Sequence, residues 1–449
     1  MFKNKQKRIL WWILIFVIIF FTHADHPLNA DEGVILEGAW NLYNNRHLYF
    51  DFFEFIPPGS FYLILAVWKI LGVSYWAAKA ISILVMFGSA VGIYLSAQII
   101  KPSKSNIAAP LLFALVSSFI ILINHNIYNL FFIIYAIYFI LLAIDQQKLK
   151  YYGFSGLFSG VAILFLQQKG LVLSGIIGLF ILIDTFKNYK NWLIYTLGLI
   201  LPLLILLVWP LKTIYYNLIV FPLSTYIEVN KISFLLLIIV LFIFILTVYF
   251  FRKSKNKKVW LLLIIQFFLI LTTIPLPDSY HLVIAVAPIF SLTGLIIDKI
   301  GTNRYFYQKI IHYYILIAIF AGFMIFPLHY LMNGYSVFSF DEKDKIQDII
   351  SKCPGKYIYV GPFAPNVYFE FRKLNATPYP LLMTSQSTPA QFENALEYLK
   401  NIKPLCAILN YPSSLNRFKY NKDNLVDNYI KDKYYLVYSD NTTFVYRLK

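Results

Sequence analysis

Long apolar segments separated by short polar ones dominate the first three quarters of the chain. Most of them are roughly 17 to 25 residues long and carry little charge, which is the length at which a helix crosses a lipid bilayer core of about 30 Å. Because lipid cannot satisfy backbone amide and carbonyl groups, such segments are expected to be helices. We expect roughly eleven spans: 11–21, 75–100, 107–123, 127–144, two that meet at 167–169, 192–211, 232–251, 259–274, 282–298 and 310–331.

The pattern changes at about Asn333 to that of a soluble domain with helices and strands. The predicted elements are helices at 340–351 and 388–401, strands at 356–360 and 406–409, and a hairpin of 434–438 and 443–446. Thr388 and Gln391 have the spacing of a capping box at the start of the second helix. The expected fold is an α-helical polytopic membrane domain, 1–331, followed by a small α/β domain, 332–449.

Composition and charge support this division and orient the chain. Hydrophobic residues make up 59% of the chain and charged residues only 14%, and the mean hydropathy is +0.64. Four basic residues precede the first span, and 252–258 is the most basic loop. The positive-inside rule predicts that both are cytoplasmic, so we expect a multi-pass cell-membrane protein with a cytoplasmic N-terminus and an exterior C-terminal domain. The net charge of +17 follows mostly from this orientation, so nucleic acid is not an expected partner.

The first exterior loop, 23–74, contains an acidic segment in an otherwise basic protein. Its carboxylates are Asp25, Asp31, Glu32, Glu37, Asp51 and Glu54. Apolar residues at helical spacing follow the pair Asp31 and Glu32, which is therefore expected at the start of an interfacial helix, near its positive dipole end. Either carboxylate can accept a proton from a hydroxyl or bind a divalent cation such as Mg²⁺ or Mn²⁺. In the alternative interpretation Asp31 is only the N-cap of this helix.

Several short motifs follow one another along the chain. They are Asp31-Glu32, 44–51, 57–62, Leu71-Gly72, 160–164 leading into 168–170, and 281–288. Together they resemble the membrane glycosyltransferases of glycosyltransferase family 39 and their lipid A aminoarabinose transferase relatives. The resemblance implies a C-type glycosyltransferase fold. It also implies that a sugar passes, with inversion, from a polyprenyl-phosphate donor to a hydroxyl of a lipid, glycan or protein acceptor on the outer face.

The resemblance implies roles for individual residues. Asp31 is expected to be the general base, with Glu32 as its substitute. The departing lipid phosphate needs cationic or hydrogen-bond-donating groups where its charge grows, and the candidates are Lys169, His281 and Arg46. Further substrate contacts are expected from Tyr49, Asp51, Pro57, Pro58, Gln168 and His125.

Each phosphate candidate also has a simpler interpretation. Lys169 can be a boundary lysine that anchors a helix, His281 can cap its span, and Arg46 can be solvated on an exposed loop. The chain also departs from the family pattern at two places. Ile56 stands where relatives commonly have a lysine, and Asn-His-Asn at 124–126 stands where they often have an acidic residue. The second departure weakens a metal site made of two carboxylates.

Other functional classes have less support. The chain has no P-loop, no dinucleotide fingerprint and no His-Glu-x-x-His motif, so nucleotide sugars, ATP and zinc-dependent proteolysis are not indicated. The rival functions are a flippase or transporter of a lipid-linked sugar and a polymerase or ligase of surface polysaccharide. A transporter would favour internal repeats and charges at mid-membrane depth, whereas the polar groups here concentrate in the predicted exterior loops.

The two cysteines, Cys353 and Cys406, both lie in the predicted exterior domain. That compartment permits a disulfide, but two cysteines without a spacing signature do not predict one. We expect Cys406 to be a small buried hydrophobic residue within a strand.

Overall fold

The computed structural model describes residues 2–24, 28–118, 120, 122–184, 188–226, 234–274, 279–301, 348–412, 415 and 418–449. The chain folds into two compact units. The helical unit comprises Met1–His26, Ala78–Leu207 and Lys231–Gly334, and the mixed unit comprises Pro27–Ala77, Val208–Asn230 and Tyr335–Lys449. The mixed unit therefore combines the acidic segment near the N-terminus with the C-terminal part of the chain.

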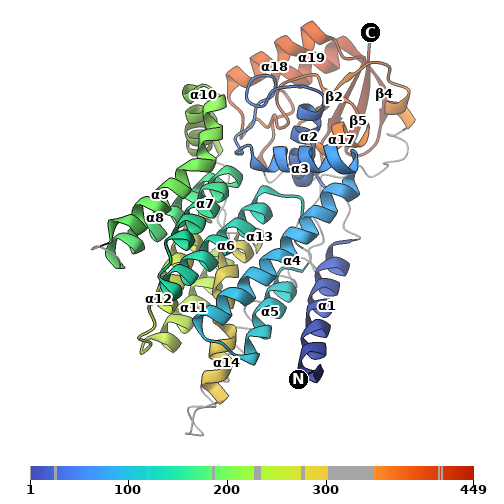
Figure 1. Cartoon of the computed structure of the whole chain (residues 1–449). Helices are drawn as coiled ribbons and strands as arrows, with labels where there is room; N and C mark the ends of the chain where they lie inside the picture. Colours follow the sequence, from blue (N-terminus) through green and yellow to red (C-terminus); the bar gives the residue numbers. More distant parts are fainter. Residues whose placement is uncertain are drawn as a thin grey trace. The chain divides into compact units, whose positions relative to one another are not determined.

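Apolar helices make up the helical unit (Figure 1). They are α1 Phe2–Ala24, α4 Tyr75–Ile100, α5 Ala108–Val116, α6 His125–Gln146, α7 Leu149–Phe165, α8 Gln167–Asp184, α9 Tyr189–Leu203, α11 Phe234–Phe251, α12 Lys257–Leu271, α13 Ser279–Val286 and α14 Thr293–Gly301. The first turn of α4 is grouped with the mixed unit. One extensive cluster of buried side chains, including Ile93, Ile137 and Leu262, forms the core of the helical unit.

Small residues bring α7 close to α9. A Cβ atom added to Gly156 would lie 2.0 Å from the carbonyl oxygen of Tyr195, and one added to Gly160 would lie 2.3 Å from that of Leu199. These two glycines are four residues apart on one face of α7, the spacing that lets membrane helices approach closely. A larger side chain at either position would push the two helices apart.

Five helices of the described residues are long and apolar enough to cross a bilayer, namely Tyr75–Ile100, His125–Gln146, Gln167–Asp184, Tyr189–Val208 and His281–Ile300. The expected helix at 107–123 is shorter than predicted, because α5 ends at Val116. The hydroxyls of Ser117 and Ser118 donate there to carbonyl oxygens four residues back. The predicted span 310–331 lies outside the described residues, so the total of eleven stays a prediction.

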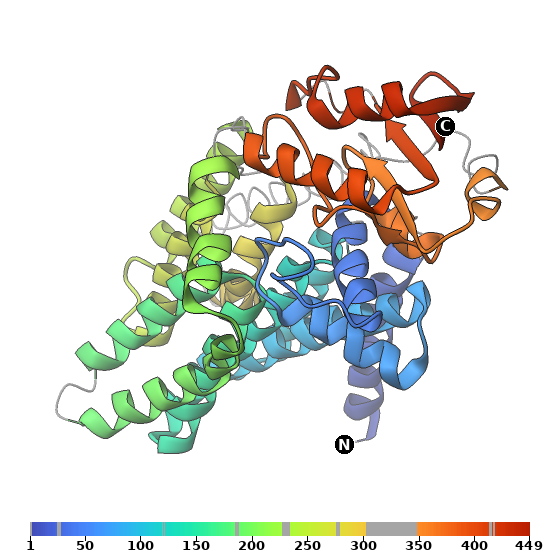
Figure 2. The ribbon, with the colours of Figure 1, turned by 90° about the horizontal axis from the view of Figure 1, so that it is seen from above.

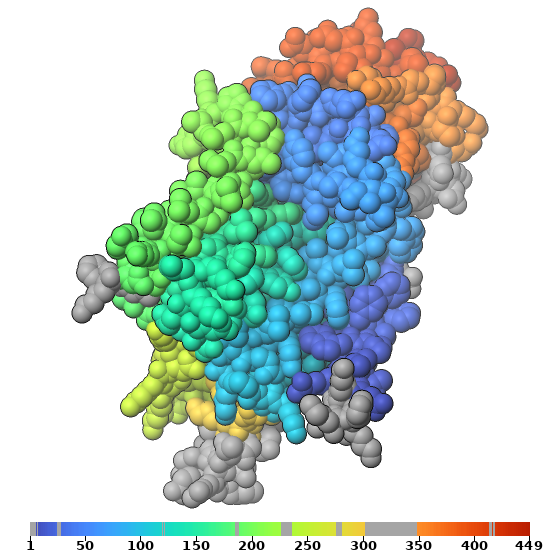
Figure 3. All heavy atoms as spheres, viewed as in Figure 1, coloured from blue at the N-terminus to red at the C-terminus, as the bar shows by residue number. Residues whose placement is uncertain are grey.

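The surface of α9 is apolar, as expected of a helix that faces lipid. Leu193, Leu197 and Leu201 are exposed, and this green segment lies at the surface in the space-filling view (Figure 3). Exposed leucines at this density would be unfavourable in water, because burying apolar surface is the main driving force of folding.

A five-stranded sheet organises the mixed unit. Its strands are β1 Tyr357–Gly361, β2 Leu374–Asn375, β3 Cys406–Asn410, β4 Tyr434–Ser439 and β5 Thr443–Leu448, in the order β2-β1-β3-β5-β4. β1 pairs in parallel with β2 and β3, whereas β5 pairs antiparallel with β3 and β4. The helices α18 Pro389–Ile402 and α19 Leu425–Lys433 lie side by side (Figure 2) and pack on the face that carries Tyr359 and Leu409. Ile350 and α17 Asn366–Glu370 pack on the other face.

Most elements predicted for the C-terminal part are confirmed. Thr388 caps α18, and its side chain and that of Gln391 form both bonds of the capping box. The strands and the closing hairpin occur where they were expected. The sequence pattern missed α17, β2 and α19. The predicted helix at 340–351 is described only from residue 348, where its last turn is helical.

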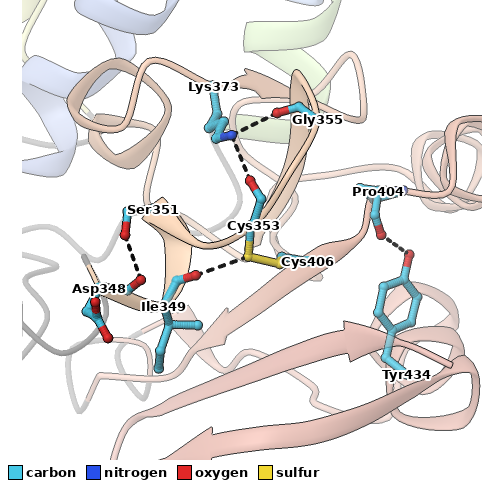
Figure 4. Close-up of a disulfide and its surroundings, with 9 residues drawn as sticks. All are labelled: Asp348, Ile349, Ser351, Cys353, Gly355, Lys373, Pro404, Cys406 and Tyr434. Atoms are coloured by element: carbon cyan, nitrogen blue, oxygen red, sulfur yellow. Dashed lines mark hydrogen bonds between the residues drawn. A yellow bond between two sulfur atoms is a disulfide. The ribbon is translucent and has the colours of Figure 1, made fainter.

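The sequence left open whether the two cysteines pair. Cys353 and Cys406 form a disulfide that joins the segment before β1 to the start of β3, across 53 residues of sequence (Figure 4). The same region is tied further by Lys373, whose ammonium donates to the carbonyl oxygens of Cys353 at 2.9 Å and Gly355 at 2.7 Å. Cys406 is buried in its strand as expected, but it is also cross-linked.

Two helices of the segment 23–74 pack against the C-terminal part within the mixed unit. They are α2 Ala30–Tyr43 and α3 Gly59–Leu71. The backbone of α17 approaches α2 so closely that a Cβ atom on Gly33 would lie 2.2 Å from the amide nitrogen of Asn366. The indole of Trp40 donates to the carbonyl oxygen of Lys373 at 2.9 Å, and Trp68 stacks on Phe369. The loop is therefore held by residues more than 300 positions away in the chain.

Candidate functional site

Asp31 and Glu32 lie in the first turn of α2, as the sequence predicts. The N-cap, however, is Asn29, whose side-chain oxygen accepts a hydrogen bond from the Glu32 backbone amide at 2.9 Å. The interpretation of Asp31 as a mere N-cap is therefore wrong, because the capping bond comes from a different residue. The dipole at this end of α2 favours negative charge at both positions.

The two carboxylates have different surroundings. Asp31 is exposed, whereas Glu32 is fully buried and accepts a hydrogen bond from the Tyr75 hydroxyl at 3.0 Å. Successive residues on a helix do not face each other. Asp31 is thus the one of the pair that an external hydroxyl can reach.

The fit of a divalent cation to this pair is poor. Among the described residues, no three His, Cys, Asp or Glu side chains gather closely enough to hold a metal ion. One carboxylate of the pair is exposed and the other is buried against a tyrosine hydroxyl, so the two do not offer a common binding point. We therefore assign no reaction step to a metal ion.

Arg46 makes hydrogen bonds inside the mixed unit. Its guanidinium donates to Asn41 Oδ1 at 3.1 Å, to the carbonyl oxygen of Asn375 at 3.3 Å and to that of Asp51 at 2.5 Å. The carboxylate of Asp51 accepts hydrogen bonds from the backbone amide of His47 at 2.6 Å and from its ring nitrogen Nδ1 at 2.9 Å. These contacts give Arg46 and Asp51 a clear part in holding the loop, and their substrate roles stay predictions.

Tyr49 and the proline pair also shape the first loop. Tyr49 is buried, has a positive φ of 65°, and donates its hydroxyl to the Ile56 carbonyl oxygen at 2.7 Å. Pro57 and Pro58 are buried, and Pro58 directly precedes α3. Pro58 is thus the N-cap residue of the second helix of the loop. Whether these residues touch a substrate stays a prediction.

Two further carboxyl groups of the loop, Glu37 and Glu54, are buried in the mixed unit, each 2% exposed. Burial raises the pKa of Glu37 to about 8, although the Asn375 amide at 3.3 Å and the charge of Arg46 partly oppose the shift. Burial, and then the nearby charge of Glu37, raise the pKa of Glu54 well above its ordinary value. Nothing in the sequence distinguishes these two acids from the exposed ones, because their burial depends on the C-terminal part of the chain.

A second polar group lies in the helical unit, around Lys169. The two helices meet close to the predicted point, 167–169: α8 begins at Gln167, and only Leu166 separates it from α7. Lys169 lies in the first turn of α8, is 1% exposed, and donates to Asn126 Oδ1 at 2.9 Å. Lys169 is therefore buried within a membrane-type helical unit rather than placed on its surface.

Histidines accompany this lysine. His125 lies within electrostatic range of both His281 and Lys169, two residues predicted from other motifs. His125 and Asn126 form the first turn of α6, after the N-cap Asn124, and not a loop as expected. Gln168 is exposed. We call Lys169, Asn126, His125 and His281 the cationic cluster.

The arrangement can support two kinds of chemistry. The cationic cluster offers an ammonium group and imidazole donors, which suit a phosphate. The exposed carboxylate at the start of α2 suits proton acceptance from a hydroxyl. The cluster belongs to the helical unit and the carboxylate to the mixed unit.

Comparisons with known proteins add a family and a fold. Residues 56–209 match the model of the dolichyl-phosphate-mannose-protein mannosyltransferase family. The structure resembles ArnT from Cupriavidus metallidurans bound to undecaprenyl phosphate, with a TM-score of 0.68, 13% identity and 98% of both chains covered. It also resembles the Archaeoglobus fulgidus oligosaccharyltransferase solved with Zn and sulfate, with a TM-score of 0.55, 12% identity, and 98% of this chain and 73% of that chain covered. No curated protein sequence matches the chain.

Proposed function

Because the chain resembles the dolichyl-phosphate-mannose-protein mannosyltransferase family over residues 56–209 and has the C-type glycosyltransferase fold of ArnT, we propose that it is a polyprenyl-phosphate-dependent glycosyltransferase of the cell membrane. It transfers a sugar, with inversion, to an acceptor hydroxyl on the outer face. The predicted resemblance is thereby confirmed for the family and the fold, while donor, acceptor and stereochemistry belong to this proposal.

The observation that carries the proposal is the cationic cluster. A charged group in the bilayer centre costs at least about 2.5 kcal/mol, so intramembrane cations are usually functional. Lys169 is 1% exposed in an apolar helical unit, with two histidines close by. A lipid carrier that lies in the membrane brings its phosphate to such a site without a soluble binding step. The ArnT structure bound to undecaprenyl phosphate supports this choice of ligand.

The reaction follows from the two polar groups. The acceptor oxygen attacks the anomeric carbon, and its proton goes to the carboxylate of Asp31. The bond between the anomeric carbon and the phosphate oxygen breaks, and its electron pair stays on the lipid phosphate. The ammonium of Lys169 and the histidine ring N–H groups stabilise the charge that grows there. Attack opposite to the leaving group inverts the anomeric centre.

Two features support an exterior position for the mixed unit. The basic loops, including 252–258, lie at the ends of the predicted spans that the positive-inside rule assigns to the cytoplasm. The disulfide between Cys353 and Cys406 suits an oxidising compartment, because cytosolic thiols are kept reduced. An outer-face reaction also fits a donor presented by the membrane.

The test uses the full chain in lipid vesicles supplied with a panel of radiolabelled polyprenyl-phosphate sugars and a membrane extract as acceptor source. The native chain is expected to transfer at least one sugar. Asp31→Asn should lower the rate at least about a hundredfold, because general-base catalysis contributes roughly that much or more. Undecaprenyl phosphate binding should be unchanged in this variant.

Lys169→Met tests the cationic cluster. It should weaken binding of undecaprenyl phosphate at least about tenfold, which corresponds to about 1.4 kcal/mol. Lys190→Met is the control, because Lys190 is an exposed lysine at the start of α9. Full transfer activity in Asp31→Asn would exclude Asp31 as the base. Movement of an intact lipid-linked sugar across the membrane without transfer would favour a flippase instead.

A further inference from the structure

Basic and aromatic side chains meet at the ends of α2 and α3 in the mixed unit. Tyr43 is the last residue of α2, and Lys69 lies in the last turn of α3. The Lys69 ammonium lies 4.7 Å from the centroid of the Tyr43 ring, and this ring stacks on Trp40 with centroids 5.8 Å apart. The guanidinium carbon of Arg372 lies 5.3 Å from the centroid of the Trp40 ring. Two cations and two aromatic rings thus form one connected group.

Contacts with the turn between α3 and α4 hold Arg372 in place. Its guanidinium donates to the carbonyl oxygen of Val73 at 3.1 Å and lies 4.5 Å from the centroid of the Phe369 ring. Trp68 stacks on that ring, and its indole donates to the carbonyl oxygen of Ser74 at 2.9 Å. The bond to Val73 uses only one of the five N–H donors of a guanidinium, so the others can bind a ligand.

The charges of these two cations are not neutralised by acidic side chains. Lys69 and Arg372 are both exposed, and within the described part of the chain neither forms an ion pair with a carboxylate. An aromatic ring positions a cation without cancelling its charge. An ammonium and a guanidinium held in this way suit a phosphate, which accepts hydrogen bonds from both kinds of group.

The segment 70–76, which joins α3 to α4, presents large apolar side chains to the surroundings. Ile70, Leu71 and Trp76 are 81%, 67% and 61% exposed. Exposed apolar patches mark surfaces that contact a partner or a membrane. The helix that follows, Tyr75–Ile100, is long and apolar enough to cross a bilayer, so this segment directly precedes a membrane span. Tryptophan and basic residues are typical of that boundary, where apolar groups meet acyl chains and cations meet headgroups.

We propose that this surface binds an anionic phospholipid of the bilayer, with Lys69 and Arg372 on its phosphate and the segment 70–76 against its acyl chains. A zwitterionic lipid is a poorer match, because its own ammonium offsets the charge of its phosphate. An acidic protein would match the cations but not the exposed apolar side chains beside a membrane span. The surface is exposed, unlike the buried cationic cluster around Lys169. Its role does not depend on sugar transfer.

The experiment locates the bound lipid by photo-crosslinking. The full chain is placed in phosphatidylcholine nanodiscs with a trace of photoactivatable phosphatidylglycerol, or of photoactivatable phosphatidylcholine with the same acyl chains. Peptide mapping after illumination measures the labelled fraction of residues 69–77. The phosphatidylglycerol label should exceed the phosphatidylcholine label about 25-fold, because each cation near a membrane surface contributes about fivefold in affinity. Lys69→Gln and Arg372→Gln should each lower this ratio about fivefold.

Two further variants serve as controls. Lys422→Gln is the matched one, since Lys422 is also an exposed lysine of the mixed unit on an aromatic ring, 4.5 Å from the centroid of Tyr411, but lies outside this surface. It should leave the ratio unchanged. Ile70→Ser should lower labelling by both lipids alike, because it removes apolar contact and no charge. If Arg372→Gln does not fold, Lys69→Gln alone decides the test.

Several outcomes would overturn the proposal. Equal labelling of residues 69–77 by the two lipids in the native chain would do so, as would an equal fall of the ratio in Lys422→Gln. Loss of the phosphatidylglycerol label on adding an equal amount of undecaprenyl phosphate would assign the surface to the lipid carrier instead. Loss of the label on adding inorganic phosphate would indicate a site for a soluble anion. Asp31→Asn should keep the ratio of the native chain, which separates lipid binding from the proposed transfer reaction.

Discussion

Glu37 shows how a single residue of the mixed unit couples stability to pH. Its carboxyl is 2% exposed, accepts a hydrogen bond from Asn375, and has a pKa of about 8 in the folded chain, against 4.5 for the ordinary group. The folded state therefore holds a proton that the unfolded state has lost between these two values. Stability from this group is complete below about pH 4.5 and decreases as the pH rises through about 8.

The corresponding prediction compares thermal unfolding of the native chain and Glu37→Gln in detergent between pH 5 and pH 9. The unfolding midpoint of the native chain should fall as the pH rises, and the fall should be smaller in the variant, because glutamine does not titrate. Glu54 titrates in the same direction, so part of the slope should remain. A midpoint of the native chain that rises with pH over this range would contradict the assignment.

Prediction at the level of residues succeeded where neighbouring residues in the sequence determine the local structure. Asp31 and Glu32 could be placed at a helix start, because a run of apolar residues at helical spacing follows them. Lys169 could be identified as a candidate from the sequence. Its buried position could not be predicted, because its partner Asn126 lies in another helix. The burial of Glu54 could not be predicted either, because residues far away in the sequence, such as Phe221 and Leu381, lie around it.

The start of α2 is the element on which the position of the base depends. The Asn29 side chain caps this helix by accepting the Glu32 amide, and a lost cap costs about 1 kcal/mol. Asn29→Ala should therefore lower the free energy of unfolding by about 1 kcal/mol and reduce sugar transfer without abolishing it. Chemical denaturation and the vesicle assay measure the two effects.

Asn188→Ala is the matched control for this prediction. Asn188 precedes α9 in the same position but makes no side-chain capping bond. Its replacement should leave stability within about 0.5 kcal/mol of the native value. Equal destabilisation by the two substitutions would show that the capping bond of Asn29 is not the cause.

Element prediction followed the strength of the local pattern. The span 75–100 matches α4 residue for residue, since a long apolar run between polar ends leaves little choice. The segment 124–126 was expected to be a loop because it is polar, yet His125 and Asn126 form the first turn of α6. The meeting point of two spans at 167–169 was placed correctly, but these residues are the first turn of α8. Polarity marked these places correctly but could not separate a loop from a buried helix start.

For the whole molecule, orientation is the main prediction that remains to be tested. The two native cysteines form a disulfide and the sequence contains no other cysteine, so one introduced cysteine gives one free thiol. Lys449→Cys should react in intact cells with a maleimide that cannot cross the membrane. Lys253→Cys, in the most basic loop, should react only after the cells are opened. Both native lysines are exposed, so the reverse labelling pattern would invert the proposed topology.

The packing of α2 against α17 has a consequence for the order in which the chain is made. The Trp40 indole and the Glu37 carboxyl bond to Lys373 and Asn375, which leave the ribosome 333 and 338 residues later. At a synthesis rate of about 5 to 20 residues per second, the loop that carries the proposed base waits tens of seconds for its partners. During that time the face of the loop that is buried in the folded protein has to be shielded by other molecules. A chain that stops before residue 348 never forms this packing. Catalytic competence is thus one of the last properties that the growing chain acquires.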